Sequence, residues 1–500
     1  MAKNFLKSSV ENASLNIILQ ILFRIVTFVL NAFVVRNVSQ DAIGVMYVRL
    51  LLLESTILFL SRDAFRKACL SKTDNHDWPK VINLMWLTVP LSIFLCLIFG
   101  YVWLCILTPP DITVTQHYAV GVVAIAVSCI IEMCSEPLYL VSQAFLFVKL
   151  RVFADILSVC IRTVSFVLLI INSAEKAVLA FSVAQILSVS SHVIFFYIYF
   201  AIHIRTMKQK LNTLDNKEKL NLNFPFYKIS DFLPKYMKNE EQIDWKLLRL
   251  VWSFLQQGVM MQILTEGERY VMTLLNILSF AEQGVFDVVN NLGSLAARFL
   301  FRPIEESAYF YFSQLIHRDK DIIKQNKTSM DEAAFVLQNL LRSVSSLGLL
   351  VVCFGQSYSR LALLLYGGTK LASGLGPKLL RTHCLAILLM AVNGSTECYA
   401  LSTMNTEKLN RYNRVMVAFS IGFLVIAWIF SYIFGSVGFI LANCCNMTAR
   451  IIHRRGYLFN ESVMLHFGIG IICFVVTLIV WLYEEKHLIK FFRHNWKKNQ

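Results

Sequence analysis

Three charged side chains lie close together in a stretch that is otherwise apolar enough to cross a bilayer. They are Glu266, Glu268 and Arg269, within the run QILTEGERYVMT. A charge at the centre of a bilayer costs about 3 kcal/mol on insertion scales, so such groups should face protein or a water-filled cavity. Arginine makes bidentate hydrogen bonds to phosphate oxygens and keeps its proton in almost any environment. These residues could therefore recognise an anionic headgroup inside a helical bundle, or simply pair helices with one another.

Two sets of four polar residues share the offsets 0, 4, 7 and 11, and both begin with the tripeptide Gln-Ile-Leu. The sets are Gln20, Arg24, Thr27 and Asn31, and Gln262, Glu266, Arg269 and Thr273. At about 100° per residue each set covers roughly 60° of a helix surface, so each forms one polar line. The repeated spacing, at the first span of each half of the chain, indicates a duplicated architecture with a site between the halves.

Charged lines also occur in three further predicted spans. They comprise Arg49, Glu54, Arg62 and Asp63 in span two, Glu132 and Glu136 in span four, and Asp287, Asn291, Arg298, Arg302 and Glu305 in span eight. The arginines outnumber the acids that directly accompany them. A basic cavity of this kind suits a phosphate or pyrophosphate group.

Structural pairing is the competing interpretation of these charges. Glu266 and Arg269 have the spacing of an intrahelical ion pair. Residues near span ends, such as Arg36, Arg62 and Arg302, could instead extend to the lipid headgroups. For Arg24 a functional role is favoured over structural pairing, because Arg24 lies well inside its span and no acid in that span is placed to neutralise it.

Apolar helices must position these side chains. The chain has 500 residues, of which 56% are hydrophobic and 16% are charged, and its mean hydropathy is +0.58. Apolar runs of about 20 residues recur throughout, each long enough for a hydrocarbon core of roughly 30 Å, whereas the short alternating strands of a barrel are absent. No cleavable signal peptide is evident. The predicted spans are 13–36, 42–62, 80–107, 116–143, 150–172, 177–204, 247–276, 281–303, 332–356, 379–403, 412–434, 436–452 and 463–484.

Basic loops predict the orientation of the spans. The net charge is +15, and most lysines and arginines lie in the connections that follow even-numbered spans, including Arg454 and Arg455 after span twelve. These connections and the N-terminus should therefore be cytoplasmic. The connection 357–378, with the glycine-rich run GGTKLASGLGP, fits this rule less well and is interpreted as flexible. The basic tail KFFRHNWKK would lie on the opposite side after thirteen spans.

The sequence divides into two predicted six-helix lobes. Residues 1–204 form the N-terminal lobe and 247–455 the C-terminal lobe, around a central cavity. The basic segment 205–246 is a cytoplasmic linker between them, and 456–500 adds about one further span and the tail. The predicted fold class is thus an all-α polytopic membrane protein.

Familiar catalytic and metal-binding motifs are missing. The sequence has no Walker lysine loop, no GxSxG, no HExxH and no His/Cys ligand cluster. The twelve cysteines are scattered, with no CxxC, and are interpreted as small apolar residues. His192 is interpreted as a helix or interface residue, and Asp319–Asp321 as a charged loop. The sequence therefore predicts no cofactor, no metal and no nucleic-acid partner.

Four longer stretches resemble the Rft family of endoplasmic-reticulum membrane proteins. They are LQILFRIVTFVLNAFVVR (19–36), GVMYVRLLLLESTILFLSRDAFRKACLS (44–71), LTEGERYVMT (264–273) and QGVFDVVNNLGSLAARFLFRPIEES (283–307). The resemblance extends over nearly the whole chain. It implies the multidrug/oligosaccharidyl-lipid/polysaccharide exporter fold, with two six-helix lobes and alternating access. Family members have two spans after the twelve-helix core, whereas this chain has room for one.

The resemblance also implies a function, namely translocation of the dolichol-pyrophosphate-linked Man5GlcNAc2 oligosaccharide to the lumenal leaflet for N-linked glycosylation. The expected protein is a monomeric flippase rather than an enzyme, in the endoplasmic-reticulum membrane. Residues expected to bind substrate are Arg24, Arg62, Arg66, Arg269, Arg298 and Arg302. Residues expected to gate or to pair the lobes are Glu54, Glu266, Glu268 and Asp287.

Three other functions compete with translocation. A cation-coupled exporter of small molecules would favour acids in the first-lobe cavity, where span one has Arg24. A dolichol-dependent glycosyltransferase would need a sizeable first lumenal loop, whereas the connection here is only 37–41. A non-transporting accessory factor for assembly of the glycolipid is compatible with the sequence.

Overall fold

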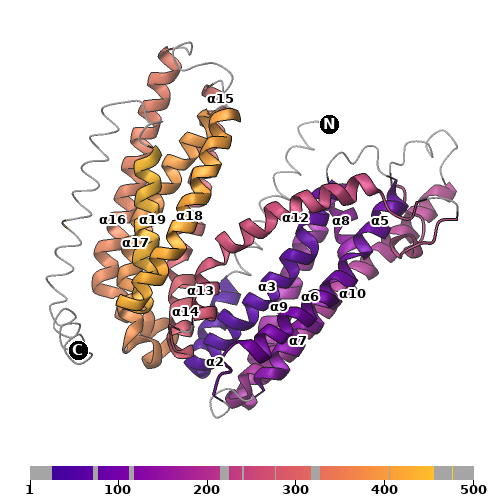
Figure 1. Cartoon of the computed structure of the whole chain (residues 1–500), viewed down its shortest axis with the longest axis horizontal. Coiled ribbons are helices and arrows are strands. Elements are labelled where there is room, and N and C mark those ends of the chain that lie inside the picture. The colour runs from indigo at the N-terminus through magenta and orange to yellow at the C-terminus, as the bar shows by residue number, and fades with distance from the viewer. Residues whose placement is uncertain are drawn as a thin grey trace. The chain divides into compact units, whose positions relative to one another are not determined.

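The described part of the protein consists mainly of helices (Figure 1). The computed structural model describes residues 25–70, 77–111, 117–213, 224–238, 241–275, 277–316, 327–404, 406–454 and 476, and these contain no strand. Seven of the described helices are long and apolar enough to cross a membrane, and a bent pair adds an eighth. Helices are expected there because hydrocarbon offers backbone N–H and C=O groups no partner except one another. The predicted all-α membrane fold is confirmed.

The chain forms two compact units. The first comprises Met1–Val288 with Leu361–Gly376, and the second comprises Val289–Arg360 with Pro377–Gln500. Three of the described helices have residues in both units: α17 (Leu375–Thr403) has only its first two residues in the first unit, and two others pass between the units further along their length. These two are α14 (Phe280–Ala296) and α16 (Lys327–Ala372). The division into lobes at 205–246 remains a prediction.

The first unit contains most of the elements that surround the charged residues of spans two to seven. After a short apolar helix, Ile25–Asn37, its elements are α2 (Gln40–Gly44), η1 (Val45–Leu50), α3 (Leu51–Leu58), η2 (Phe59–Asp63), α4 (Ala64–Leu70), α5 (Trp78–Trp86), α6 (Thr88–Tyr101), η4 (Val102–Ile106), α7 (Tyr118–Met133), α8 (Glu136–Ala144), α9 (Val148–Asn172), η5 (Ala174–Lys176), α10 (Ala177–Thr213), η6 (Ile229–Phe232), α12 (Trp245–Thr265) and α13 (Gly267–Leu275).

Short π-helical turns interrupt the spans that contain the charged lines. Both η1 and η2 lie within predicted span two, and η7 (Ala297–Phe301) lies in predicted span eight. A π turn has more residues than an α turn, so it rotates the side chains that follow it relative to a 3.6-residue period. The directions of Arg62 and Arg298 are consequently not those that a regular helix would give.

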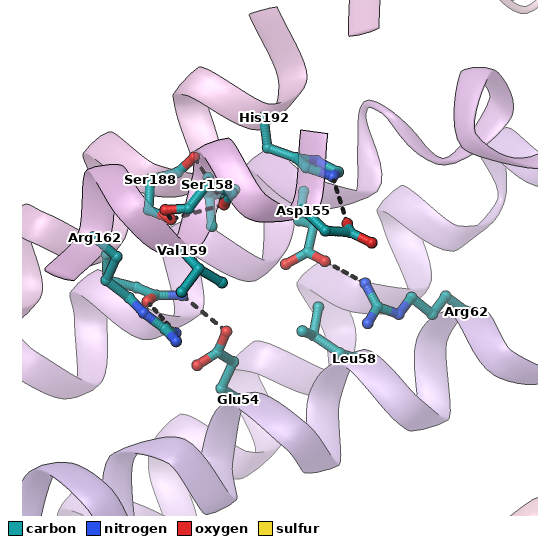
Figure 2. A pocket seen from close by; sticks show the side chains of 12 residues that line it. Glu54, Leu58, Arg62, Asp155, Ser158, Val159, Arg162, Ser188 and His192 are labelled. Atoms are coloured by element: carbon teal, nitrogen blue, oxygen red, sulfur yellow. Dashed lines mark hydrogen bonds and ion pairs between the residues drawn. The ribbon is translucent and has the colours of Figure 1, made fainter. Parts of the chain in front are cut away.

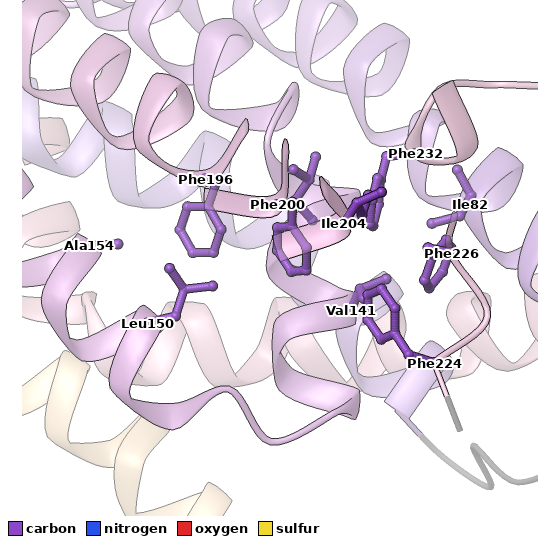
Figure 3. Close-up of a cluster of buried hydrophobic side chains, with 11 residues drawn as sticks. Ile82, Val141, Leu150, Ala154, Phe196, Phe200, Ile204, Phe224, Phe226 and Phe232 are labelled. Carbon is purple, nitrogen blue, oxygen red and sulfur yellow. The ribbon is translucent and has the colours of Figure 1, made fainter. Parts of the chain in front are cut away.

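Aromatic side chains hold part of the predicted linker against the first unit. Phe224, Phe226 and Phe232 are buried in a cluster with Phe196 and Phe200 of α10 (Figure 3). Their burial removes large apolar surfaces from water. Polar contacts add to this docking, because the Trp86 indole donates to the Phe232 carbonyl at 2.8 Å. The described residues 224–238 therefore belong to the packing of the first unit.

The second unit is a bundle of long helices. Its remaining elements are α15 (Arg302–Leu315), α17 (Leu375–Thr403), α18 (Thr406–Phe434) and α19 (Ser436–Arg454). The helices α18 and α19 pack along one another. Phe312 of α15 is buried against Tyr399 of α17, with ring centroids 5.1 Å apart. The final predicted span, 463–484, and Asp319–Asp321 lie outside the described residues apart from position 476.

The glycine-rich run GGTKLASGLGP, expected to be a flexible connection, forms the end of α16 and the start of α17. The helix continues to Ala372 with a kink at Gly368, whose φ of 71° suits glycine. Arg36 donates through Nε to the Tyr366 carbonyl at 3.2 Å, and Gln40 donates to the Lys370 carbonyl at 2.8 Å. These bonds satisfy helix-end carbonyls that would otherwise lack partners, which is why the segment packs with the first unit.

Two glycines allow α2 and α14 to touch backbone to backbone. A Cβ atom on Gly284 would collide with the Gln40 carbonyl oxygen and lie 2.8 Å from the Gly44 nitrogen. Close approach of this kind is typical of helices packed through small residues in membranes.

We expect Gly284→Ala to destabilise the protein by about 1–3 kcal/mol, because the backbones must separate to admit the methyl group. Thermal unfolding of the purified chain in detergent measures the effect. The control is Gly422→Ala in α18, where no atom lies within 4 Å of the added Cβ and stability should stay the same or rise slightly. Equal unfolding temperatures for Gly284→Ala and wild type would contradict the packing argument.

Candidate functional site

A polar cavity of about 290 Å³ lies inside the first unit (Figure 2). It is an open cavity, lined by residues of α3, η2, α7, α9 and α10. Its charged and polar lining consists of Glu54, Arg62, Glu132, Asp155, Ser158, Arg162, Gln185, Ser188 and His192. A cavity of this polarity among membrane helices is a candidate binding site, since such groups are costly in hydrocarbon and are placed to face water or a ligand.

Arg62 and Arg66 are neutralised by two carboxylates from span four. Arg62 forms ion pairs with Glu132 and, at 3.5 Å, with Glu136. Arg66 binds Glu136 through two hydrogen bonds of 2.7 and 2.6 Å, and its guanidinium lies 3.8 Å from the Tyr139 ring centroid. Such bidentate pairs hold their geometry tightly. These arginines are therefore engaged by protein groups, and anion binding by them stays a prediction.

A second polar chain crosses the cavity from α3 to α10. Gln185 donates to Glu54 at 2.8 Å and accepts from Arg162 at 3.3 Å. Asp155, near the mouth, lies 3.5 Å from His192 Nε2 and has a side chain that is 60% exposed. Glu54 thus faces the inside of the first unit, and its predicted role in gating remains open.

Sequence analysis missed Asp155, Arg162 and Gln185, and it assigned His192 to the packing of helices. A usable signal was present. Asp155 and Arg162 are seven residues apart in span five, and Gln185 and His192 are seven apart in span six. Seven residues make two helical turns, so each pair lies on one face.

Arg269 joins two acids in the first unit. It donates to Glu266 at 3.1 Å and to Asp287 of α14 at 3.0 Å. Gln262 and Thr273, which complete the predicted line, are both buried. The charges of QILTEGERYVMT are thus directed into protein, as the membrane argument required.

The helix that bears these residues is broken, contrary to the expectation of one continuous span. α12 ends at Thr265, Glu266 has non-helical angles of φ −99° and ψ 11°, and α13 begins at Gly267. The sequence has no proline here, and Gly267 was the one local signal of the break. Glu268 lies just after it, partly buried.

The predicted line of span eight does not lie along one face. Asp287 is buried in the first unit, whereas Arg298, inside the π turn, and Arg302, just after it, are exposed. Arg302 pairs at 3.4 Å with Glu306, one turn along the same helix. Arg298 donates to Ser294 and, at 3.2 Å, to the Asn291 carbonyl, and both are neutral groups. Arg298 is thus a cation that the described part of the chain leaves available to an anion.

A buried arginine in the second unit was misplaced by the sequence analysis. Arg454, expected in a basic loop, has 0% exposure. It donates to the Tyr412 hydroxyl at 2.7 Å and to the Asn393 carbonyl at 2.8 Å, and it forms an ion pair with Glu397 at 2.8 Å. Arg454 therefore joins α17, α18 and α19. Because it is not a loop residue, it does not indicate which side of the membrane the connection after span twelve lies on.

Arg24 lies outside the described residues. Among the residues that the structure does describe, no group of histidine, cysteine, aspartate and glutamate side chains could hold a metal ion.

Comparison with known proteins decides the family. The profile of the Rft protein family matches residues 8–460. The Man(5)GlcNAc(2)-PP-dolichol translocation protein RFT1 of Xenopus tropicalis is 45% identical over 457 residues, which are 91% of this chain and 83% of that protein. The protein of the same name from Drosophila melanogaster is 44% identical over 480 residues, 92% of this chain and 86% of that protein. The chain belongs to the Rft protein family.

Solved structures similar to this Rft protein share its fold. An inward-facing multidrug-resistance MATE family transporter of the MOP superfamily aligns with a TM-score of 0.58 at 11% identity, covering 86% of this chain and 94% of that one. The lipid II flippase MurJ, in an inward closed conformation, aligns with a TM-score of 0.53 at 12% identity, covering 93% and 99%. The predicted resemblance and the multi-helix membrane architecture are both confirmed.

Proposed function

We propose that this Rft protein moves the Man5GlcNAc2 glycolipid, linked through pyrophosphate to dolichol, from the cytoplasmic to the lumenal leaflet of the endoplasmic reticulum. The supporting observation is 44–45% identity, over about nine tenths of the chain, to proteins named for this translocation. The protein acts as a multi-pass monomer with a cytoplasmic N-terminus and performs no covalent chemistry. No nucleotide-binding motif is required for this role.

Arginine side chains would hold the pyrophosphate of the glycolipid. Among the described candidates, Arg298 has the strongest case, because its recorded hydrogen bonds go only to neutral groups. Arg302 has a partner on its own helix, and that pair is largely exposed. An exposed pair of this kind contributes little and can open when a phosphate approaches. Arg24 is proposed on sequence grounds alone.

The ion pairs of the first unit suit a gating or pairing role. Arg269 links Glu266 to Asp287 of α14, the helix that continues into the second unit. A movement of α14 would therefore either break the ion pair between Arg269 and Asp287 or move Arg269 together with α14. We propose that Glu266 and Asp287, with Glu268 and Glu54, stabilise one state of the transporter.

Reconstitution tests the proposed function directly. Purified full-length protein is incorporated into lipid vesicles with labelled Man5GlcNAc2-PP-dolichol, and exchange between leaflets is followed. Exchange faster than in protein-free vesicles is expected. Absence of exchange, in protein that restores N-glycosylation to deficient cells, would overturn translocation in favour of an accessory role in glycolipid assembly.

A further inference from the structure

The cavity of the first unit has the wrong charge for a pyrophosphate. Its lining contains three carboxylates, from Glu54, Glu132 and Asp155, against the two guanidinium groups of Arg62 and Arg162. Just behind it, Arg66 and Glu136 cancel one another. The two guanidinium groups do not outnumber the carboxylates, so the lining offers no surplus of positive charge to balance a dianionic group in a poorly screened interior. The lining therefore suits a neutral ligand better than a pyrophosphate.

The cavity also offers hydrogen-bond donors and acceptors in alternation. Only Oε1 of Glu54 and one nitrogen of Arg162 take part in the chain through Gln185. The other Glu54 oxygen and the other Arg162 N–H groups are available, as is the exposed Asp155 carboxylate. A sugar hydroxyl both donates and accepts, so neighbouring hydroxyls can bind a carboxylate and a guanidinium at once. A metal ion would need converging acids, and no such group occurs among the described residues.

Mutual hydrogen bonds fix these side chains before any ligand arrives. Gln185 is held between Glu54 and Arg162, and Ser158 and Ser188 bond one another at 2.8 Å on the adjoining wall. Groups that are already ordered lose little further conformational freedom on binding. At about 290 Å³ the cavity is near the lower end of small-molecule sites, which begin at roughly 300 Å³, so it has room for one or two sugar rings and not for a heptasaccharide.

We propose that this cavity is a sugar-binding subsite, which takes part of the neutral glycan of the glycolipid while the pyrophosphate is bound elsewhere. This inference rests on the proposed function, since it assigns one portion of that substrate to the first unit. The proposal assigns the two parts of the substrate to different arginines. Those that line the cavity bind sugar hydroxyls, and Arg298 binds the pyrophosphate.

Binding of the free glycan tests the proposal without transport. The probe is Man5GlcNAc2 released from lipid and phosphate, with a fluorescent label at its reducing end, titrated into full-length protein in nanodiscs. Asp155→Ala and Arg162→Met should each weaken binding at least tenfold. Asp63→Ala, a matched change on η2 that does not line the cavity, should bind as wild type. Inorganic pyrophosphate in excess should leave the glycan bound.

Several outcomes would overturn the subsite. They are no glycan binding by wild type, unchanged binding by both cavity variants, or displacement of the glycan by pyrophosphate. Because Asp155 is exposed at the mouth, its variant should fold even if Arg162→Met does not. Vesicle exchange with the same preparations separates the two proposals. If wild type exchanges the glycolipid but the cavity variants bind the free glycan as well as wild type does, only the sugar subsite is ruled out. If the cavity variants lose glycan binding but wild type does not exchange the glycolipid, only translocation is ruled out.

Discussion

Replacing Arg298 with alanine is expected to slow glycolipid exchange between leaflets by about 10- to 100-fold at subsaturating glycolipid. A hydrogen bond to a charged group contributes about 1.5–3 kcal/mol, and each 1.4 kcal/mol corresponds to a factor of ten. Arg298 is exposed and bonded only to Ser294 and Asn291, so its removal exposes no buried carboxylate. Protein abundance and unfolding temperature should therefore stay near those of wild type.

Two comparisons make the Arg298 result specific. Arg298→Lys keeps the charge but loses the planar fork, so it should recover part of the exchange rate. Arg414→Ala, at an exposed arginine of α18, should exchange as wild type. N-glycosylation in deficient cells provides an independent readout. A loss of abundance matching the loss of exchange would show that Arg298 serves packing and would contradict pyrophosphate binding.

Replacing Arg454 with methionine is expected to destabilise the protein by about 3 kcal/mol or more. Breaking a buried ion pair costs about 3–5 kcal/mol, because the remaining charge loses its partner. The Glu397 side chain is 31% exposed and can regain some water, which places the effect toward the lower end. The Tyr412 hydroxyl and the Asn393 carbonyl also lose their donor.

Thermal unfolding of the purified protein measures the loss of stability that Arg454→Met causes. The double variant Arg454→Met with Glu397→Gln should be more stable than Arg454→Met alone, because it removes the orphaned carboxylate. Arg414→Met on the surface of α18 is the control and should unfold as wild type. Additive effects of the two substitutions at 454 and 397 would contradict the ion-pair explanation.

Sequence reasoning identified the partners of the span-two arginines without identifying the partnership. Arg62, Glu132 and Glu136 were recognised as unusual charges in apolar runs, and Arg66 was expected from the family resemblance, but helical periodicity relates residues on one helix only. Which helix faces which depends on packing between spans. The seven-residue spacing of Asp155 with Arg162, and of Gln185 with His192, placed each pair on one helix face, but only the packing of the helices showed that both pairs line the same cavity.

Hydropathy by itself determined that this is an all-helical membrane protein, and spacing predicted that its charges turn inward, which holds for Arg269 and Asp287 but not for Arg302. Hydrocarbon provides no hydrogen-bond partners, so the chain must form helices and direct ionised groups toward protein. Only the tertiary structure decided which charges remain available. A helix break at Glu266, a π turn before Arg302 and the burial of Arg454 are all compatible with the same apolar helical pattern. Local periodicity cannot distinguish them, because their stability comes from contacts between helices that lie far apart in the sequence.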